Sequence, residues 1–224
     1  MKMEYSVVIP AYNAARTIAE SIQSILNQSV KALEIVVVDD GSTDDTHHIA
    51  RSQDACVTVI TQSNQGPGAA MTRAMHRVHT PVIASLDADD VWLPNKMQHQ
   101  LAFLEQHPTC AGCFGQLQHF GESVHSEIVT DGWTRTTMTI RREVFESVGE
   151  VIDPPGRRGE LIDWIAKARE SGFELTMIPK ILAKRRVAAG TLSHQRNDQD
   201  RGYVHVARAA LLRKRAREQA SVRS

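Results

Sequence analysis

Short apolar runs alternate with segments of helical periodicity along the first half of the chain. The apolar runs have the length of strands and predict strands over 5–10, 33–38, 56–61 and 81–86. Apolar residues three and four positions apart predict helices over 14–27, 68–78 and 95–106, with Pro94 at the start of the last one. Residues 42–45 (STDD) have the pattern of a capping box that begins another helix. This alternation predicts an α/β fold with a mainly parallel sheet flanked by helices on both faces.

The second half is less regular and predicts a smaller subregion that follows the first. The expected elements are short strands within 109–140, helices over 142–148 and 160–171, a strand over 181–186 and a basic amphipathic helix over about 201–217. We therefore predict a single domain over 1–200, with one half over 1–107 and another over 108–200. A basic C-terminal helix and tail over 201–224 follow this domain.

Charge is unevenly distributed although the 224-residue chain has a formal net charge of zero. Residues 201–224 contain seven Arg or Lys and the single acid Glu218. This basic segment is a candidate contact for an acidic partner or a membrane surface, but such a run is more often the solvated face of a helix, and we favour that interpretation. Nucleic-acid binding is not expected, because Tyr203 is the one aromatic ring among these basic residues.

Cysteine usage and hydropathy predict a cytoplasmic location. Three cysteines offer no disulfide framework, which favours a reducing compartment, and we expect Cys110 and Cys113 to be structural. No apolar run approaches the ~20 residues of a membrane-spanning helix, and the first residues do not resemble a signal peptide. Peripheral membrane association remains open through the basic tail.

Three carboxylates follow the last strand of the first half, in residues 86–90 (LDADD). Two carboxylates ~4 Å apart repel by about 4 kcal/mol at an effective dielectric near 20, so a cation is expected beside them. In an extended segment Asp87 and Asp89 would point the same way and could share Mg²⁺ or Mn²⁺. The alternative is an acidic loop that caps the helix beginning near Pro94.

Polar residues follow several of the predicted parallel strands. Asn13, the pair Asp39-Asp40 and residues 87–90 each follow a strand of the first half. The carboxyl ends of parallel strands meet at one edge of a sheet, where ligands bind. We therefore expect these residues to converge on one rim.

Three segments in this order resemble the signatures of family 2 glycosyltransferases: residues 7–13 (VVIPAYN), 37–44 (VVDDGSTD) and 86–90 (LDADD). The resemblance implies a GT-A type fold, in which a nucleotide-binding half and an acceptor-binding half form a single domain. Residues 1–107 would then be the nucleotide-sugar-binding half. Residues 108–200 would be the smaller acceptor-side subregion.

The resemblance also assigns roles to residues of the donor site. Pro10, Tyr12 and Asn13 would line the pocket for base and ribose, and Tyr12 offers a ring for stacking. Asp40 would accept a hydrogen bond from a uracil-like base, with Asp39 nearby. Asp87 would lie near the ribose and Asp89 on the metal ion, as the two acids of the family's metal motif.

Two further segments match the family incompletely. Residues 64–70 (NQGPGAA), with Asn64 and Gly66, resemble the glycine-containing approach to the nucleotide, but Met71-Thr72 stands where Arg-Asn is common. Residues 185–193 (RRVAAGTLS) resemble a basic closing motif without its frequent histidine. Arg186, or alternatively Arg185, would contact phosphate.

The expected general base is Glu160, and Asp163 is the alternative. Residues 159–164 (GELIDW) stand where the family carries an acidic pair before a helix, and Leu161 replaces the second acid. A carboxylate on the acceptor side can take the proton of an attacking hydroxyl. Glu160 would also interact favourably with a helix dipole, which is its purely structural interpretation.

Together these observations predict inverting transfer of a sugar from a nucleoside-diphosphate sugar, UDP-type favoured, to an unidentified acceptor with Mg²⁺ or Mn²⁺. A non-catalytic nucleotide-sugar-binding protein is the first alternative, because Leu161 and Met71-Thr72 depart from the family pattern. A nucleotidyltransferase is less favoured, because residues 11–17 lack a glycine-rich basic loop.

Overall fold

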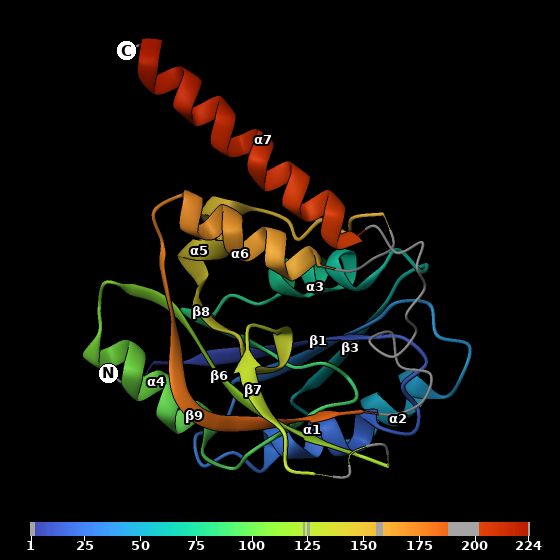
Figure 1. Cartoon of the computed structure of the whole chain (residues 1–224). Helices are drawn as coiled ribbons and strands as arrows, with labels where there is room; N and C mark the ends of the chain where they lie inside the picture. The colour runs from blue at the N-terminus through green and yellow to red at the C-terminus, as the bar shows by residue number, and fades with distance from the viewer. Residues whose placement is uncertain (1–2, 123, 125, 156–158, 188–201, 224) are drawn as a thin grey trace.

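One nine-stranded sheet forms the centre of the molecule (Figure 1). The computed structural model describes residues 3–122, 124, 126–155, 159–187 and 202–223. The strands are β1 (Tyr5–Ala11), β2 (Glu34–Asp39), β3 (Val57–Thr61), β4 (Val82–Ser85), β5 (Val91–Trp92), β6 (Cys110–Phe120), β7 (Val129–Gly132), β8 (Thr139–Arg141) and β9 (Glu174–Arg186). The helices are α1 (Ile18–Leu26), α2 (Thr46–Arg51), α3 (Pro67–Arg77), α4 (Lys96–Gln106), α5 (Arg142–Val148), α6 (Glu160–Glu170) and α7 (Gly202–Arg223), with a 3₁₀ turn, η1 (Arg135–Thr137).

The first four long strands form a parallel unit in the order β3-β2-β1-β4. Helices connect them, as the alternating pattern predicted. Strand order reverses at β1, which lies between β2 and β4, and such a reversal is where open α/β sheets bind ligands. The carboxyl ends of these strands therefore form the rim on which the candidate site is built.

The sheet continues in the order β8-β6-β9-β5, beginning with an antiparallel pair of β4 and β8. Strands β8, β6 and β9 come from the second half, and β5 comes from the first. The expectation of several short strands within 109–140 is only partly right, because β6 is a single strand of 11 residues. Strand β9 has 13 residues and is longer than the predicted 181–186. A Cβ on Gly115 of β6 would lie 2.4 Å from the Leu182 side chain of β9. Gly115 is therefore needed because β6 and β9 pack closely there, and it does not mark the end of a strand.

Two apolar layers cover the faces of the sheet (Figure 1). Helices α1, α2 and α4 pack on one face, and α3, α5 and α6 pack on the other. Successive residues of β1 alternate between them: Val7 and Ile9 belong to the first layer and Val8 to the second. Cys110 and Cys113 are unpaired and buried in β6, in agreement with a structural role.

Helix starts differ from the predicted ones. Helix α4 begins at Lys96, so Pro94 precedes the helix. No capping box forms at residues 42–45: α2 begins at Thr46, and the Asp44 carboxylate accepts the Thr46 N–H at 3.1 Å and the Ala15 N–H at 3.0 Å. This carboxylate joins two loops of the rim, a contact that local sequence does not reveal.

Helix α7 crosses α6 and continues past it (Figure 1). It is longer than predicted, and its apolar residues do not lie on one side: Val206 is buried, whereas Val204, Leu211 and Leu212 are exposed. The prediction of a one-sided amphipathic helix is therefore wrong. Within the described parts of the chain, no helix combines the length and hydropathy that crossing a bilayer requires.

Lys96 is a fully buried lysine beneath the second half of the sheet. Its Nζ lies 3.8 Å from the centroid of the Trp92 ring and 3.3 Å from the Thr139 hydroxyl. Burial disfavours the ammonium form and lowers the pKa of Lys96 to about 7. At neutral pH the amine is therefore only partly protonated.

We expect Lys96 to make stability rise with pH between 7 and about 9. In this window the unfolded chain binds a proton at Lys96 that the native state does not, so the free energy of unfolding increases by up to about 1.4 kcal/mol per pH unit. Above this window the Cys113 thiol, whose pKa burial raises to about 12, opposes the trend. Lys96→Met should flatten the slope and raise stability at pH 7 in denaturant titrations. Lys180→Met, at an exposed position of β9, is the control. If the free energy of unfolding of Lys96→Met rises with pH as steeply as that of the wild type, Lys96 is not the group responsible.

Candidate active site

The loops after β1 and β2 are joined by Asn13. Its side-chain oxygen accepts the Thr43 N–H at 2.8 Å, and its own N–H donates to the Ser42 hydroxyl at 2.9 Å. Asn13 has a φ of +49°, a conformation that asparagine tolerates better than most residues. The predicted convergence of these two loops is confirmed.

The other residues predicted for base and ribose differ in accessibility. Tyr12 is 53% exposed, so its ring faces solvent beside the rim. Pro10 is buried within β1 and pairs with Val38, so it supports the rim and does not line its surface. Asp39 is also buried, and its carboxylate accepts the Ser42 N–H at 3.0 Å.

Asp40 organises the loop that follows β3. Its buried carboxylate accepts hydrogen bonds from the Gln62 side chain at 2.7 Å and from the N–H groups of Gln65 and Gly66, both at 2.8 Å. This loop contains Asn64 and is the glycine-containing segment singled out in the sequence. Asp40 thus shapes the loop after β3 at this rim, and a contact from its carboxylate to a base stays a prediction.

Asp153 fastens the same loop to the second half of the chain. Its two carboxylate oxygens accept the N–H groups of Gly68 and Ala69, each at 3.0 Å, at the amino end of α3. Gly66 has a φ of +109°, and a Cβ there would lie 2.6 Å from an Asp153 oxygen. The positive φ favours glycine at Gly66, and a larger residue there would also displace the Asp153 carboxylate.

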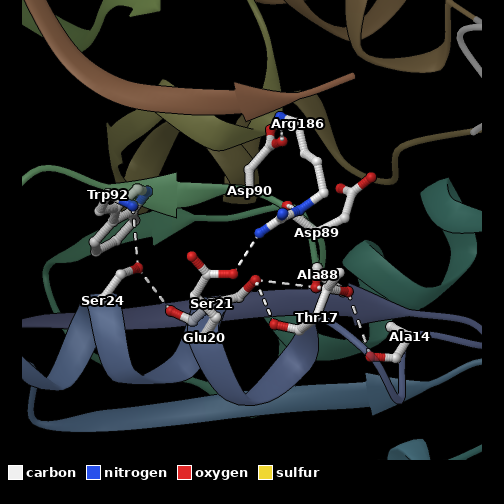
Figure 2. Close-up of polar contacts among 10 residues, drawn as sticks. All are labelled: Ala14, Thr17, Glu20, Ser21, Ser24, Ala88, Asp89, Asp90, Trp92 and Arg186. Carbon is white, nitrogen blue, oxygen red and sulfur yellow. Dashed lines mark hydrogen bonds and ion pairs between the residues drawn. The ribbon is translucent and has the colours of Figure 1, made fainter. Parts of the chain in front are cut away.

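Residues 87–90 form a tight turn and not the extended segment that we expected, because the Asp90 N–H donates to the Asp87 carbonyl at 3.1 Å. Helix α1 holds this turn from below (Figure 2). The hydroxyls of Thr17 and Ser21 donate to the Ala88 carbonyl at 2.9 and 3.0 Å. The acidic turn is thereby attached to the helix that follows β1.

Asp90 is the buried member of the acidic turn. Its carboxylate lies within hydrogen-bond distance of the Thr136 hydroxyl and accepts the Arg186 N–H at 2.8 Å. Burial, with the charges of Asp87 and Asp89, raises the pKa of Asp90 well above its usual range. Asp90 connects the turn to η1 and to the end of β9, which suits a structural role.

Asp89 is the residue of the acidic turn whose carboxylate has no side-chain partner among the described residues. Burial and the charge of Asp87 raise the pKa of Asp89. Among the described residues no other side chain forms a hydrogen bond or ion pair with its carboxylate, which points away from the contacts drawn in Figure 2. No group of three or more His, Cys, Asp or Glu within the described ranges is placed to hold a metal ion. One or two carboxylates nevertheless fit Mg²⁺ or Mn²⁺ that is completed by substrate phosphates.

Arg135 forms an ion pair with a carboxylate of the acidic turn. Its Nε donates to Asp87 Oδ1 at 2.6 Å, and its Nη1 donates to Glu160 Oε1. Burial opposes the charged form of Arg135, but Asp87 and Glu160 outweigh burial and raise the pKa of its guanidinium. One buried side chain thus joins the proposed metal turn to the proposed base.

The alternative base, Asp163, has other partners. Its carboxylate forms ion pairs with Lys167 at 2.9 Å and with Arg213 of α7 at 2.8 Å. These contacts place Asp163 at the junction of α6 and α7, whereas Glu160 faces Arg135. The geometry favours Glu160 over Asp163.

Arg186 lies at the rim but already has partners. Its Nε donates to the Asp89 carbonyl at 3.0 Å, and its Nη2 forms an ion pair with Glu20 of α1 (Figure 2). Its guanidinium also lies 4.5 Å from the centroid of the Phe120 ring. Arg186 closes the acidic turn against α1, and contact with phosphate stays a prediction.

Sequence reasoning missed Arg135, Thr136 and Asp153 as residues of the site. Each lies in an irregular segment of the second half, far along the chain from its partners. The excess of carboxylates in residues 87–90 did indicate that a cation was needed, but it did not indicate which residue provides it.

The family model for glycosyl transferase family 2 matches residues 6–157. The chain belongs to this family. The match contains all three segments that carried the resemblance, together with Arg135 and Asp153. Glu160, α6 and α7 lie beyond it.

Curated relatives include glycosyltransferases that match less than half of the chain. An uncharacterized glycosyltransferase of Nostoc sp. is 43% identical over 100 residues, covering 43% of this chain and 31% of the relative. The succinoglycan biosynthesis protein ExoU of Rhizobium meliloti is 41% identical over 100 residues, covering 43% of this chain and 29% of the relative. Each match therefore spans less than a third of the relative's own length.

Solved structures confirm the GT-A fold. S. aureus TarS 1–349 in complex with UDP-GlcNAc aligns with a TM-score of 0.75 at 20% identity, over 94% of this chain and 66% of that one. The mannosyltransferase PcManGT from Pyrobaculum calidifontis, in complex with GDP-Man and Mn²⁺, aligns with a TM-score of 0.67 at 19% identity. The alignment covers 86% of this chain and 59% of that one. At these identities the likeness shows the fold alone.

Proposed function

We propose that this family 2 protein transfers a sugar from a nucleoside-diphosphate sugar to an acceptor hydroxyl with inversion of configuration. The observation that carries the proposal is the Arg135 contact, which brings Asp87 of the acidic turn and Glu160 of the acceptor half to one guanidinium. A donor site and a base beside it are what a single displacement requires.

The donor site is proposed at the carboxyl ends of β1, β2 and β4. Tyr12 offers an exposed ring for a base, and the Asn13 and Asp40 contacts hold the surrounding loops in place. A UDP-type donor is favoured by analogy with TarS, whose structure contains UDP-GlcNAc, while PcManGT with GDP-Man keeps a guanine nucleotide as the alternative.

Asp89, with Asp87, is proposed to hold Mg²⁺ or Mn²⁺ together with the donor diphosphate. When bound, such an ion supplies Lewis-acid stabilisation of the leaving diphosphate. Asp87 keeps its contact with Arg135 on one side, and Asp89 has no competing side-chain partner among the described residues. The PcManGT complex, which contains Mn²⁺, supports a divalent ion by analogy.

Glu160 is proposed to take the acceptor proton. The acceptor oxygen forms a bond to the anomeric carbon as the bond from that carbon to the diphosphate breaks, and the hydroxyl proton moves to the Glu160 carboxylate. Attack from the face opposite the leaving group inverts the anomeric centre. Glu160 is only 7% exposed, so little water competes at its carboxylate.

We expect Asp89→Ala to abolish metal-dependent donor binding while the fold survives. UDP-, GDP- and dTDP-sugars would be screened by thermal shift with Mn²⁺ and with EDTA, because a ligand that binds the native state raises the melting temperature. Asp45→Ala, which removes an exposed carboxylate of the same rim, is the control. Donor binding unchanged by EDTA or by Asp89→Ala would contradict the ion assignment.

We expect Glu160→Gln to leave donor affinity unchanged and to reduce transfer by about 100-fold or more, because the amide cannot accept the proton. Asp163→Asn should retain most activity, since its carboxylate serves the contact of α6 with α7. Turnover is measured as release of nucleoside diphosphate with and without acceptor. Severe loss in Asp163→Asn alone would place the base there, and donor binding without any turnover would support the non-catalytic alternative.

The basic helix α7 is proposed to dock on an anionic lipid surface. Val204, Arg208, Leu211 and Arg215 follow the spacing of one helix face, and all four are exposed. On the opposite face Val206 is buried and Arg213 forms ion pairs with the body. Although the helix as a whole is not amphipathic, the cationic residues of this exposed face are attracted to the surface of an anionic bilayer.

We expect sedimentation with phosphatidylglycerol vesicles and not with phosphatidylcholine vesicles. Arg208→Glu/Arg215→Glu should weaken partitioning by at least about tenfold, because each basic residue contributes about 1 kcal/mol near such a surface. Arg51→Glu/Lys180→Glu makes the same charge change at exposed positions outside α7 and should retain binding. If both double variants lose vesicle binding equally, or if the wild type does not sediment with the vesicles, α7 does not dock on lipid. It would then bind an acidic protein or have no partner.

A further inference from the structure

The backbone around Arg135 is anchored to the donor half of the sheet. The Arg135 carbonyl accepts the Ser85 hydroxyl of β4 at 2.7 Å. The next carbonyl, that of Thr136, accepts the indole N–H of Trp92 in β5 at 2.7 Å. These bonds fix the point from which the Arg135 side chain extends.

The Arg135 guanidinium is held at one end by the acidic turn. Its Nε contacts Asp87, and the Thr136 hydroxyl lies 3.3 Å from the other oxygen of the same carboxylate. The side chain is 17% exposed, so solvent screens these contacts only weakly. The orientation of Nη1 toward α6 is therefore set before any substrate arrives.

The Glu160 carboxylate depends on Arg135 for its direction. Glu160 begins α6 directly after Gly159, and no side chain caps this helix. Among the described residues, Arg135 is the one side chain that forms a hydrogen bond or ion pair with the Glu160 carboxylate. Leu161 follows it in place of the second acid, so no neighbouring carboxylate duplicates its position.

We infer that Arg135 is a positioning residue for the proposed transfer reaction: it holds the Glu160 carboxylate beside the Asp87 turn. This inference rests on the proposed function. The base belongs to the acceptor half and the turn to the donor half, and one planar guanidinium sets the separation between them. A lysine cannot reproduce this geometry, because its single ammonium lacks the rigid fork that reaches two carboxylates.

The inference is tested by a double-mutant cycle of Arg135→Met and Glu160→Gln in the full chain, with kcat, donor KM and thermal unfolding measured for each variant. Arg135→Met should reduce kcat by about tenfold or more and change donor KM by less than about threefold, because a small displacement of a catalytic group is costly. In the Glu160→Gln background the same substitution should change kcat by less than about twofold, since the group it positions is gone.

Two further variants separate positioning from folding. Arg142→Met removes another partly buried arginine, which forms an ion pair with Glu146 away from the acidic turn, and should leave kcat unchanged. Arg135→Lys retains the charge and should still reduce kcat. If Arg135→Met does not fold, the cycle is run with Arg135→Lys.

Three outcomes would overturn the inference. Additive losses of kcat in the cycle would show that Arg135 acts independently of Glu160. Full activity of Arg135→Lys would show that charge alone is needed. A folded wild type that binds no donor and transfers no sugar would overturn the proposed function and this inference with it, whereas an active wild type with an additive cycle would overturn the inference alone.

Discussion

The site depends on how the acidic charge that follows β4 is offset. Asp87, Asp89 and Asp90 lie within four residues, and their mutual repulsion requires cationic or hydrogen-bonding partners. Arg135 pairs with Asp87, and the Thr136 hydroxyl and the Arg186 N–H bind Asp90. Asp89 is the carboxylate left without a side-chain partner among the described residues. Two of the three carboxylates are thus bound by other groups of the protein, and Asp89 is the one that the proposed metal ion would use.

The same partners join the two halves of the chain. Arg135 and Thr136 belong to η1, which precedes β8, and Arg186 ends β9. Their contacts with the turn after β4 bring the second half of the sheet against the rim formed by the carboxyl ends of β1, β2 and β4. Because Arg135 also binds Glu160, the start of α6 is placed by the interaction that stabilises the acidic turn.

Carboxylates elsewhere on the rim hold the loops in place through backbone contacts. Asp39, Asp40, Asp44 and Asp153 each accept backbone N–H groups from a loop or helix start. Short polar side chains are well suited to this, because they satisfy donors that turns and helix starts leave unpaired. The acidic motifs of the sequence therefore contain residues with two different tasks, of which binding a ligand is only one.

Periodicity in the sequence determined the strands and helices of the first half, because each β-strand or helix has to bury an apolar face whose spacing is visible locally. It also placed Asn13, Asp39-Asp40 and residues 87–90 at strand ends, and so on one rim. In the second half, packing obscured the pattern: Gly115 in β6 marks close contact with β9, not the end of a strand.

Only the tertiary structure decided which acids have partners and which cation binds them. Arg135 is 48 residues from Asp87 and 25 from Glu160, and Asp153 is 85 from Gly68. The excess of carboxylates in residues 87–90 indicated that a cation was needed. Which residue provides it depends on how the whole sheet is assembled. The residues around each partner do not indicate these pairs, because residues far apart in the sequence become neighbours only when the chain folds.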